Sequence, residues 1–181
     1  MKAKVFKITG LIFLSIFVSI FTFLIYLTWN YPIKFKNEIK KFSDKYSVSS
    51  YIVASVINVE SSYNEKALSN KGAIGLMQIL PSTGEWLAKK ISIDNFSTQM
   101  LYDPALNIEI GTFYLKYLLD KFSNLNTALC AYNAGEGVVS NWLSDKNYSQ
   151  DGKTLIKIPY KETNLYIEKL QKNFNFYKLK V

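Results

Sequence analysis

Two residue types that carry much of protein chemistry are missing from this chain. It contains no histidine, and its 22 basic residues are all lysines, so arginine is absent too. Without imidazole, the Ser-His-Asp and Cys-His catalytic sets and histidine-ligated zinc or iron are excluded. Without guanidinium, no bidentate clamp on phosphate groups can form. Any catalysis must therefore rest on carboxylate, lysine, hydroxyl or amide groups.

Cysteine is represented only by Cys130, which cannot form an internal disulfide. It stands in an apolar run and is expected to be a buried small side chain. The formal net charge of +8 suits polyanions such as cell-wall polymers or acidic lipids. No basic run is interleaved with aromatic residues, as a nucleic-acid groove would require, so we expect no nucleic-acid partner.

A long uncharged segment stands near the N-terminus, at residues 8–29. As a helix rising about 1.5 Å per residue it is about 33 Å long, enough to cross a bilayer. The apolar region of a cleaved signal peptide is shorter and is followed by small residues, and neither feature is present. We therefore predict an uncleaved signal anchor at 8–29, a short cytoplasmic tail at 1–7 and a lysine-rich stalk at 30–45, with a short helix over 34–46 as the alternative.

The charges that flank this segment bear on its orientation. Lys2, Lys4 and Lys7 favour a cytoplasmic N-terminus, but five lysines between residues 34 and 45 weaken that argument. Long domains cross the membrane largely regardless of charge. The orientation is therefore decided by what the domain after the anchor does.

Residues 46–181 are predicted to form one all-α domain, because apolar stripes of helical period recur and sustained strand alternation is absent. Ser49 is expected to cap a helix that ends at Glu60. The segment Ser82–Glu85 has capping-box spacing, and Asp103 followed by proline is typical of a helix start. Further helices are predicted over 126–135, 137–143 and 160–176.

Glu60 occupies an unusual position on its predicted helix. At 100° per residue it falls inside the apolar arc formed by Ile52, Val53, Val56 and Ile57. An ionised carboxylate there loses solvation, so its pKa should rise, and a carboxylic acid that stays protonated near neutral pH is what a general acid needs. The alternative is that the helix frays before Glu60 and the side chain simply reaches water.

Several short motifs follow Glu60 in a fixed order. They read ESSYN at 60–64, ALS at 67–69, GAIGLMQILP at 72–81, AYNAG at 131–135 and PYKETNLY at 159–166. Over roughly residues 46–170 the chain resembles the soluble-lytic-transglycosylase family of lysozyme-like, peptidoglycan-cleaving enzymes. It departs from the family at Glu65, where proline is frequent, and at Leu80, where methionine is frequent.

The resemblance implies a lysozyme-like helical domain after the transmembrane helix predicted above, with Glu60 as the sole catalytic acid and base. It also implies a sugar cleft that is lined by Ser69, Gln78, Tyr132 and Tyr166. Asn133 follows Tyr132 at the same helix end, and we expect its amide to bind the substrate as well. The residue types suit these roles. The Gln78 amide can bind an N-acetyl group, aromatic faces stack on sugar rings, and a tyrosine phenol can hold the Glu60 carboxyl in position.

Glycoside hydrolysis normally uses two carboxyl groups. Among the other acidic residues, Glu85 and Asp103 are explained as caps, Glu109 as a residue of the long helix and Glu162 as structural. Asp94, in a polar loop, is left without an explanation. The resemblance implies instead that a single carboxylate works alone and that the substrate's own 6-hydroxyl closes on C1, with no water, metal or cofactor.

Three other functions remain open at this point. A goose-type muramidase would share the fold and the acid but use water. A catalytically silent wall-binding module would not need Glu60, and a domain in the cytoplasm would meet no peptidoglycan. The resemblance implies an extracytoplasmic domain in the cell membrane, anchored through residues 8–29, with peptidoglycan glycan strands as its partner. The sequence identifies no partner in the cell-envelope machinery.

Overall fold

The structure is a computed structural model that describes residues 2–181, with side chains from residue 10 onward. It divides into two compact units, Met1–Pro32 and Ile33–Val181. The described residues form helices, one 3₁₀ turn and isolated β-bridges, which confirms the predicted all-α class. The side chains of the predicted cytoplasmic tail, residues 1–7, lie outside the described residues.

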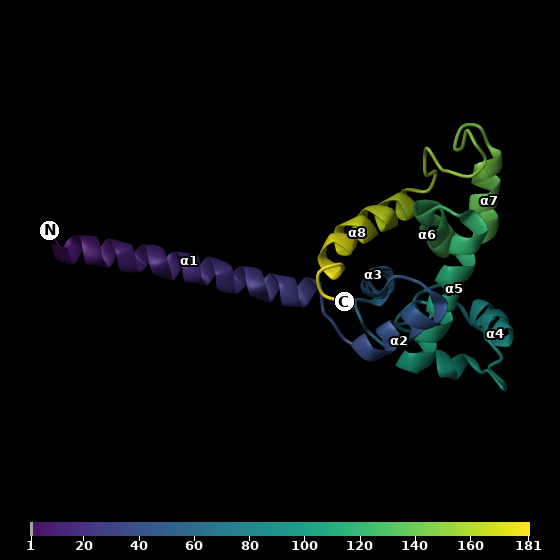
Figure 1. The fold of residues 1–181 in the computed structure, drawn as a ribbon, viewed down its shortest axis with the longest axis horizontal. Coiled ribbons are helices and arrows are strands. Elements are labelled where there is room, and N and C mark those ends of the chain that lie inside the picture. The colour runs from purple at the N-terminus through teal and green to yellow at the C-terminus, as the bar shows by residue number, and fades with distance from the viewer. Residues whose placement is uncertain (1) are drawn as a thin grey trace. The chain divides into compact units, whose positions relative to one another are not determined.

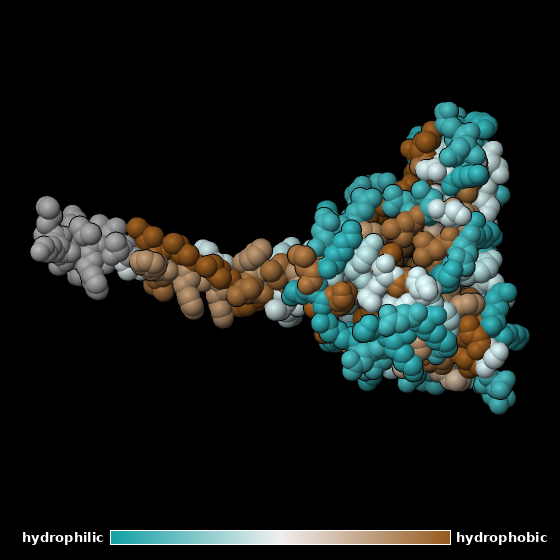
Figure 2. Space-filling view, viewed as in Figure 1, coloured by the Kyte–Doolittle hydropathy of each residue, from teal (hydrophilic) through white to brown (hydrophobic). Residues whose placement is uncertain are grey.

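The first unit is a single helix, α1 (Lys2–Asn30). Its segment Gly10–Asn30 has a mean hydropathy of 2.5 and no buried residue, so by length and composition it can cross a membrane. Figure 2 shows the apolar side chains along it. Hydroxyl groups at four positions, from Ser15 to Thr28, donate hydrogen bonds to carbonyls three or four residues earlier. The helix therefore leaves none of these four hydroxyls unpaired, as a hydrocarbon environment requires.

Helix α2 (Lys36–Tyr46) lies within the segment that was predicted to be a stalk. Its Ile39 and Phe42 are buried, and the helix packs against α3 and α5 of the second unit. The folded domain therefore begins about ten residues earlier than predicted. Apolar residues at helical spacing are few here among many lysines, which is why composition alone indicated a polar linker.

Helix α3 (Ser50–Ser61) is the central element of the second unit, with Val53, Val56 and Ile57 fully buried. It packs against α8 (Lys161–Tyr177) on one side and α2 on another. Ser49 precedes α3 as predicted, but its side chain makes no capping hydrogen bond. Figure 1 shows α3 enclosed by the other helices of the domain.

The longest helix of the domain is α5 (Pro104–Phe122), and it packs against α6 (Leu125–Ala134). The predicted start of α5 is confirmed, because the Asp103 carboxylate accepts a hydrogen bond of 2.8 Å from the Leu106 N–H. Helix α6 begins one residue earlier than predicted, and Asn124 caps it. The last predicted helix agrees with α8 within one residue at each end.

Smaller elements complete the domain: α4 (Pro81–Lys90), the 3₁₀ turn η1 (Thr98–Tyr102) and α7 (Glu136–Ser144). The predicted capping box at Ser82 is wrong, because α4 starts at Pro81, whose fixed φ suits the first helical position. Glu85 instead accepts an exposed hydrogen bond of 2.8 Å from Lys89, one turn later.

Candidate active site

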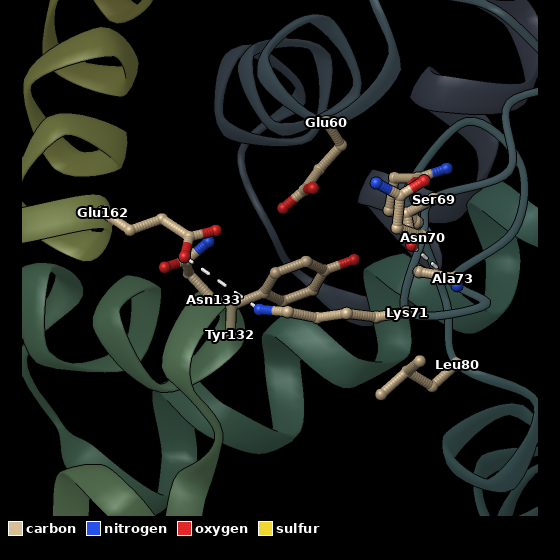
Figure 3. Close-up of a pocket in the computed structure, with 10 residues that line it drawn as sticks. Glu60, Ser69, Asn70, Lys71, Ala73, Leu80, Tyr132, Asn133 and Glu162 are labelled. Carbon is tan, nitrogen blue, oxygen red and sulfur yellow. Dashed lines mark hydrogen bonds and ion pairs between the residues drawn. The ribbon is translucent and has the colours of Figure 1, made fainter. Parts of the chain in front are cut away.

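A pocket of about 340 Å³ opens where the end of α3, the loop 62–80, the end of α6 and the start of α8 meet (Figure 3). Its lining residues are Glu60, Ser69, Asn70, Lys71, Ala73, Gln78, Leu80, Tyr132, Asn133 and Glu162. The structure thus brings five of the six predicted site residues to one cavity, from segments up to 73 residues apart in sequence.

Glu60 lies in the last turn of α3, which continues to Ser61, so the helix does not fray before it. The Ser61 hydroxyl donates a hydrogen bond of 2.8 Å to the Leu76 carbonyl and thereby ties this helix end to the pocket loop. In Figure 3 the Glu60 carboxyl points into the pocket. The residue is partly buried, and this position inside the apolar arc has a direct electrostatic consequence.

Burial raises the pKa of the Glu60 carboxyl from 4.5 to about 7. The nearby Tyr166 hydroxyl opposes this shift, because it stabilises the ionised form, and the negative charge of Glu162 adds to it. A large fraction of Glu60 therefore keeps its proton at neutral pH. This is the protonation state that a general acid needs.

Tyr166 does not line the pocket but lies behind it, with 6% of its surface exposed. Its hydroxyl is buried beside the Glu60 carboxyl without reaching hydrogen-bond geometry to any described residue. Burial, and then the charge of Glu60, raise the pKa of this phenol well above its ordinary value, so it stays a neutral donor. Tyr166 was predicted to line the cleft, but the structure puts it behind the pocket wall, against the Glu60 carboxyl.

Tyr132 lines the pocket, but its hydroxyl donates a hydrogen bond of 2.8 Å to the Met77 carbonyl. This phenol is therefore occupied with the pocket loop and not with Glu60. Its ring contacts Tyr114 on α5, with 5.2 Å between centroids. Tyr132 thus anchors the loop to α6, and its ring forms part of the pocket wall (Figure 3).

The pocket loop is shaped by two unusual backbone positions. Gly75 has φ +77°, and a Cβ there would stand 2.6 Å from the Leu101 carbonyl oxygen, so no other residue fits. Gln78 is left-handed at φ 48°. Its amide nitrogen donates to the Gly75 carbonyl at 2.9 Å and to the Ala67 carbonyl at 3.4 Å. The acceptor oxygen of Gln78 stays available to a bound molecule.

Asn107, on α5, holds this loop in place and was missed by sequence reasoning. It is fully buried, accepts a hydrogen bond of 2.8 Å from the Met77 N–H, and donates to the carbonyls of Ile74 and Leu101. The buried Asn107 amide thus makes hydrogen bonds with three backbone groups that have no partner in a regular helix or sheet. The available signal was a polar residue on the buried face of the predicted long helix.

The remaining predicted residues also make internal bonds. The Ser69 hydroxyl accepts a hydrogen bond of 2.9 Å from the Ala73 N–H. Asn133 accepts one of 2.8 Å from the Thr163 hydroxyl, which links the end of α6 to α8. Each of the two side chains lines the pocket and is at the same time held at a defined place in its wall.

The two acidic residues considered as companions of Glu60, Asp94 and Glu162, do not lie where the sequence led us to expect. Asp94 lies with Glu85 and Lys89 around another cavity, and Glu60 is not part of it. Glu162, which was predicted to be structural, lines the Glu60 pocket and pairs with Lys71 at 4.0 Å (Figure 3). The carboxylate that shares the pocket with Glu60 is therefore Glu162. Among the residues described with side chains, no group of three or more acidic or cysteine residues could hold a metal ion.

Residues 37–156 match the transglycosylase SLT domain family. The chain belongs to this family. It is 34% identical over 146 residues to a soluble lytic murein transglycosylase of Escherichia coli K12, covering 79% of this chain and 23% of that protein. It is also 37% identical over 111 residues to a membrane-bound lytic murein transglycosylase C of Haemophilus influenzae, covering 56% of this chain and 31% of the relative.

The lytic transglycosylase Slt of Pseudomonas aeruginosa, solved as an inactive glutamate-to-glutamine mutant, has the same fold. Its structure superposes with a TM-score of 0.76 at 29% identity, over 85% of this chain and 25% of that one. The family resemblance and the lysozyme-like fold expected from the motifs are thereby confirmed. The chain spans about a quarter of the length of the E. coli and P. aeruginosa relatives, so the likeness concerns one part of longer proteins.

Proposed function

We propose that this chain is a membrane-anchored peptidoglycan lytic transglycosylase. It cleaves the β-1,4 bond between N-acetylmuramic acid and N-acetylglucosamine and forms a 1,6-anhydro-muramoyl end. The observation that carries the proposal is the Glu60 carboxyl, whose pKa is raised to about 7 and which faces a pocket open to solvent. The relatives that match this domain are lytic transglycosylases by name.

Glu60 performs both proton transfers in the proposed reaction. Its protonated carboxyl gives a proton to the glycosidic oxygen as the bond to C1 breaks, and the leaving sugar departs as an alcohol. The ionised carboxylate then takes the proton of the muramoyl 6-hydroxyl, whose oxygen bonds to C1. Glu60 ends protonated as it began, and no water enters the products. A pKa near the working pH makes both steps accessible.

The surrounding residues position the acid and the sugar. Tyr166 lies on the Glu60 carboxyl from behind, where its hydroxyl can donate to the ionised form as substrate tightens the site. The Gln78 amide oxygen and the Ser69 hydroxyl suit the polar groups of an N-acetyl sugar. The Tyr132 ring offers a face for sugar packing, and Asn133 supports it from the same helix end.

A goose-type muramidase is the second candidate, and the placement of Glu162 is the observation that favours it. Activation of a water molecule would need a second carboxylate in the same pocket. The Glu162 side chain, however, is 77% exposed and pairs with Lys71. The negative charge of Glu162 also raises the pKa of Glu60. A silent wall-binding module would have no need of a carboxyl held protonated in its pocket.

The membrane part of the proposal rests on α1 and on the membrane-bound relative. Because peptidoglycan lies outside the cytoplasmic membrane, the N-terminus is placed inside and the domain outside. The domain, taken as residues 33–181, should not need the anchor for chemistry, because the pocket is built entirely within it.

The test combines one variant pair with one isotope. Glu60→Gln should lower cleavage of purified peptidoglycan at least about a hundredfold, the scale of general acid catalysis. Glu162→Gln should keep the rate within about tenfold of the wild type, because it removes only the influence of the Glu162 charge on the pKa of Glu60. Digestion in ¹⁸O-labelled water should give unlabelled anhydro products. Labelled reducing ends, together with a collapse of activity in Glu162→Gln, would identify a muramidase.

Orientation has its own test. A reporter fused after Val181 should be accessible to protease from outside in intact spheroplasts, and a protected reporter would reverse the topology. A chain that starts at residue 31 should be soluble, helical by circular dichroism and active on peptidoglycan, because it keeps the whole of α2.

A further inference from the structure

The net positive charge of the domain is confined to its two ends in sequence. Between residues 47 and 176 the side chains include twelve lysines and twelve acidic residues, which cancel. Segment 33–46 holds five lysines and two acidic residues, and segment 177–181 adds two lysines. The whole excess of five positive side-chain charges in residues 33–181 therefore comes from these two short segments.

The fold brings the two segments together. Lys36 and Lys40 of α2 line a pocket of about 490 Å³ together with Lys180, and Ser50 at the start of α3 borders it. Lys178 lies over the Tyr51 ring, with 5.0 Å from its Nζ to the ring centroid. Figure 1 shows the end of the chain beside α3 and near α2. We name Lys36, Lys40, Lys178, Leu179 and Lys180 the basic face.

Few acidic side chains neutralise this face. Lys40 pairs with Asp44 at 2.9 Å, but both side chains are at least 65% exposed, so this pair is weak. Glu38 is the other acidic residue of α2, and it does not line the pocket. Lys36 and Lys180 have no carboxylate within ion-pair distance among the described residues. Three lysines and no acidic side chain thus line the pocket, a charge balance that favours anions.

An exposed apolar side chain stands among these charges. Leu179 is 87% exposed, between Lys178 and Lys180. Lysines around an exposed leucine are typical of surfaces that bind at a bilayer interface, where the cations meet anionic headgroups and the apolar group enters the acyl boundary. An anionic wall polymer would satisfy the lysines but would gain nothing from the leucine.

The chain itself keeps this face near the membrane. Lys36 follows Asn30, the last residue of α1, by six residues, which span at most about 21 Å when fully extended. If α1 crosses the bilayer, as the proposed function requires, Lys36 stays within that distance of the helix end in any orientation of the domain.

We propose that the basic face docks on anionic phospholipid headgroups of the membrane that holds α1. This proposal rests on the membrane anchor in the proposed function. Docking gives the domain a defined orientation, because α3 starts beside the basic face at Ser50 and carries Glu60 ten residues later, about 15 Å along the helix axis. The active-site pocket is then held away from the headgroups and open to glycan.

The test uses the full chain in lipid nanodiscs, made either of phosphatidylcholine alone or with about one third phosphatidylglycerol. A fluorophore on Leu179→Cys reports contact with a quencher attached to lipid headgroups, and one on Gln150→Cys serves as the distant control. Native Cys130 is buried, and its pKa is raised to about 12 by burial, so it should not be labelled. We expect at least about threefold stronger quenching at 179 in the anionic discs, suppressed by high salt, and no change at 150.

A matched set of charge variants separates this face from general basicity. Lys36→Gln, Lys40→Gln and Lys180→Gln together should abolish the difference between the discs. The same change at three exposed lysines elsewhere, Lys146, Lys153 and Lys157, should preserve it. Equal quenching in both discs, or a difference that survives the first set, would overturn the docking proposal. A chain that does not enter the discs would overturn the anchor and docking together, whereas glycan cleavage in detergent tests the enzymatic proposal separately.

Discussion

Replacing Glu60 by glutamine should stabilise the domain, and the gain should depend on pH. The folded protein holds the Glu60 proton with a pKa of about 7, against 4.5 for the unfolded chain. The tighter binding of the Glu60 proton by the folded state adds to the free energy of unfolding, and this contribution is fully present below about pH 4.5. It is lost as the pH rises through about 7, because the buried carboxyl must then ionise in the folded state. Glutamine has a similar shape and carries no charge at any pH.

The magnitude follows from the pKa shift. A shift of about 2.5 units, at about 1.4 kcal/mol each, corresponds to about 3 kcal/mol. This is an upper bound, because the carboxyl faces a pocket open to solvent and is partly screened. We expect Glu60→Gln to be more stable than the wild type by about 1 to 3 kcal/mol above pH 7.5, relative to the difference between the two proteins at pH 4.5.

The assay is urea unfolding of residues 31–181, followed by circular dichroism at half-unit steps from pH 4.5 to 8.5. The quantity of interest is the difference in unfolding free energy between variant and wild type, so that all other titrating groups cancel. Glu168→Gln, on an exposed part of α8, is the matched control. A pH-dependent difference for Glu60→Gln that does not exceed that of the control would refute the raised pKa and, with it, the basis of the proposed acid.

The remaining predictions concern the reaction and the pocket loop. Cleavage by the wild type should fall about tenfold per pH unit above the Glu60 pKa of about 7, and a rate that still rises at pH 8.5 would contradict a protonated acid. Gly75→Ala should destabilise the domain by more than about 1 kcal/mol in urea, whereas Gly137→Ala, with open space around it, should be neutral or stabilising; equal effects would disprove the tight contact. Tyr132→Phe should cost about 1 kcal/mol, because the Met77 carbonyl loses its partner, and an unchanged midpoint would mean that this bond carries no stability.

Helix positions and the candidate acid could be predicted from the sequence, because both depend on local pattern. Asp103 with its following proline marked the start of α5, and the periodic apolar stripe around Glu60 marked a carboxyl out of place. Local pattern was not enough at α2, which was predicted to be a stalk outside the domain but packs within it. Ile39 and Phe42 are only two apolar positions among lysines, and their burial depends on faces of α3 and α5 that no local pattern reveals.

Sequence by itself determined that this domain is helical, that its chemistry is limited to carboxylate, hydroxyl, amide and lysine groups, and that Glu60 is its candidate acid. Only the tertiary structure decided which carboxylate accompanies it. Asp94 and Glu162 are equally polar in sequence, but α8 carries Glu162 to the pocket, whereas Asp94 lies in the loop after α4, around another cavity. Periodicity is a property of neighbours along the chain, whereas the position of Tyr166 beside Glu60, or of Lys36 and Lys180 around one pocket, depends on how helices far apart in sequence pack together.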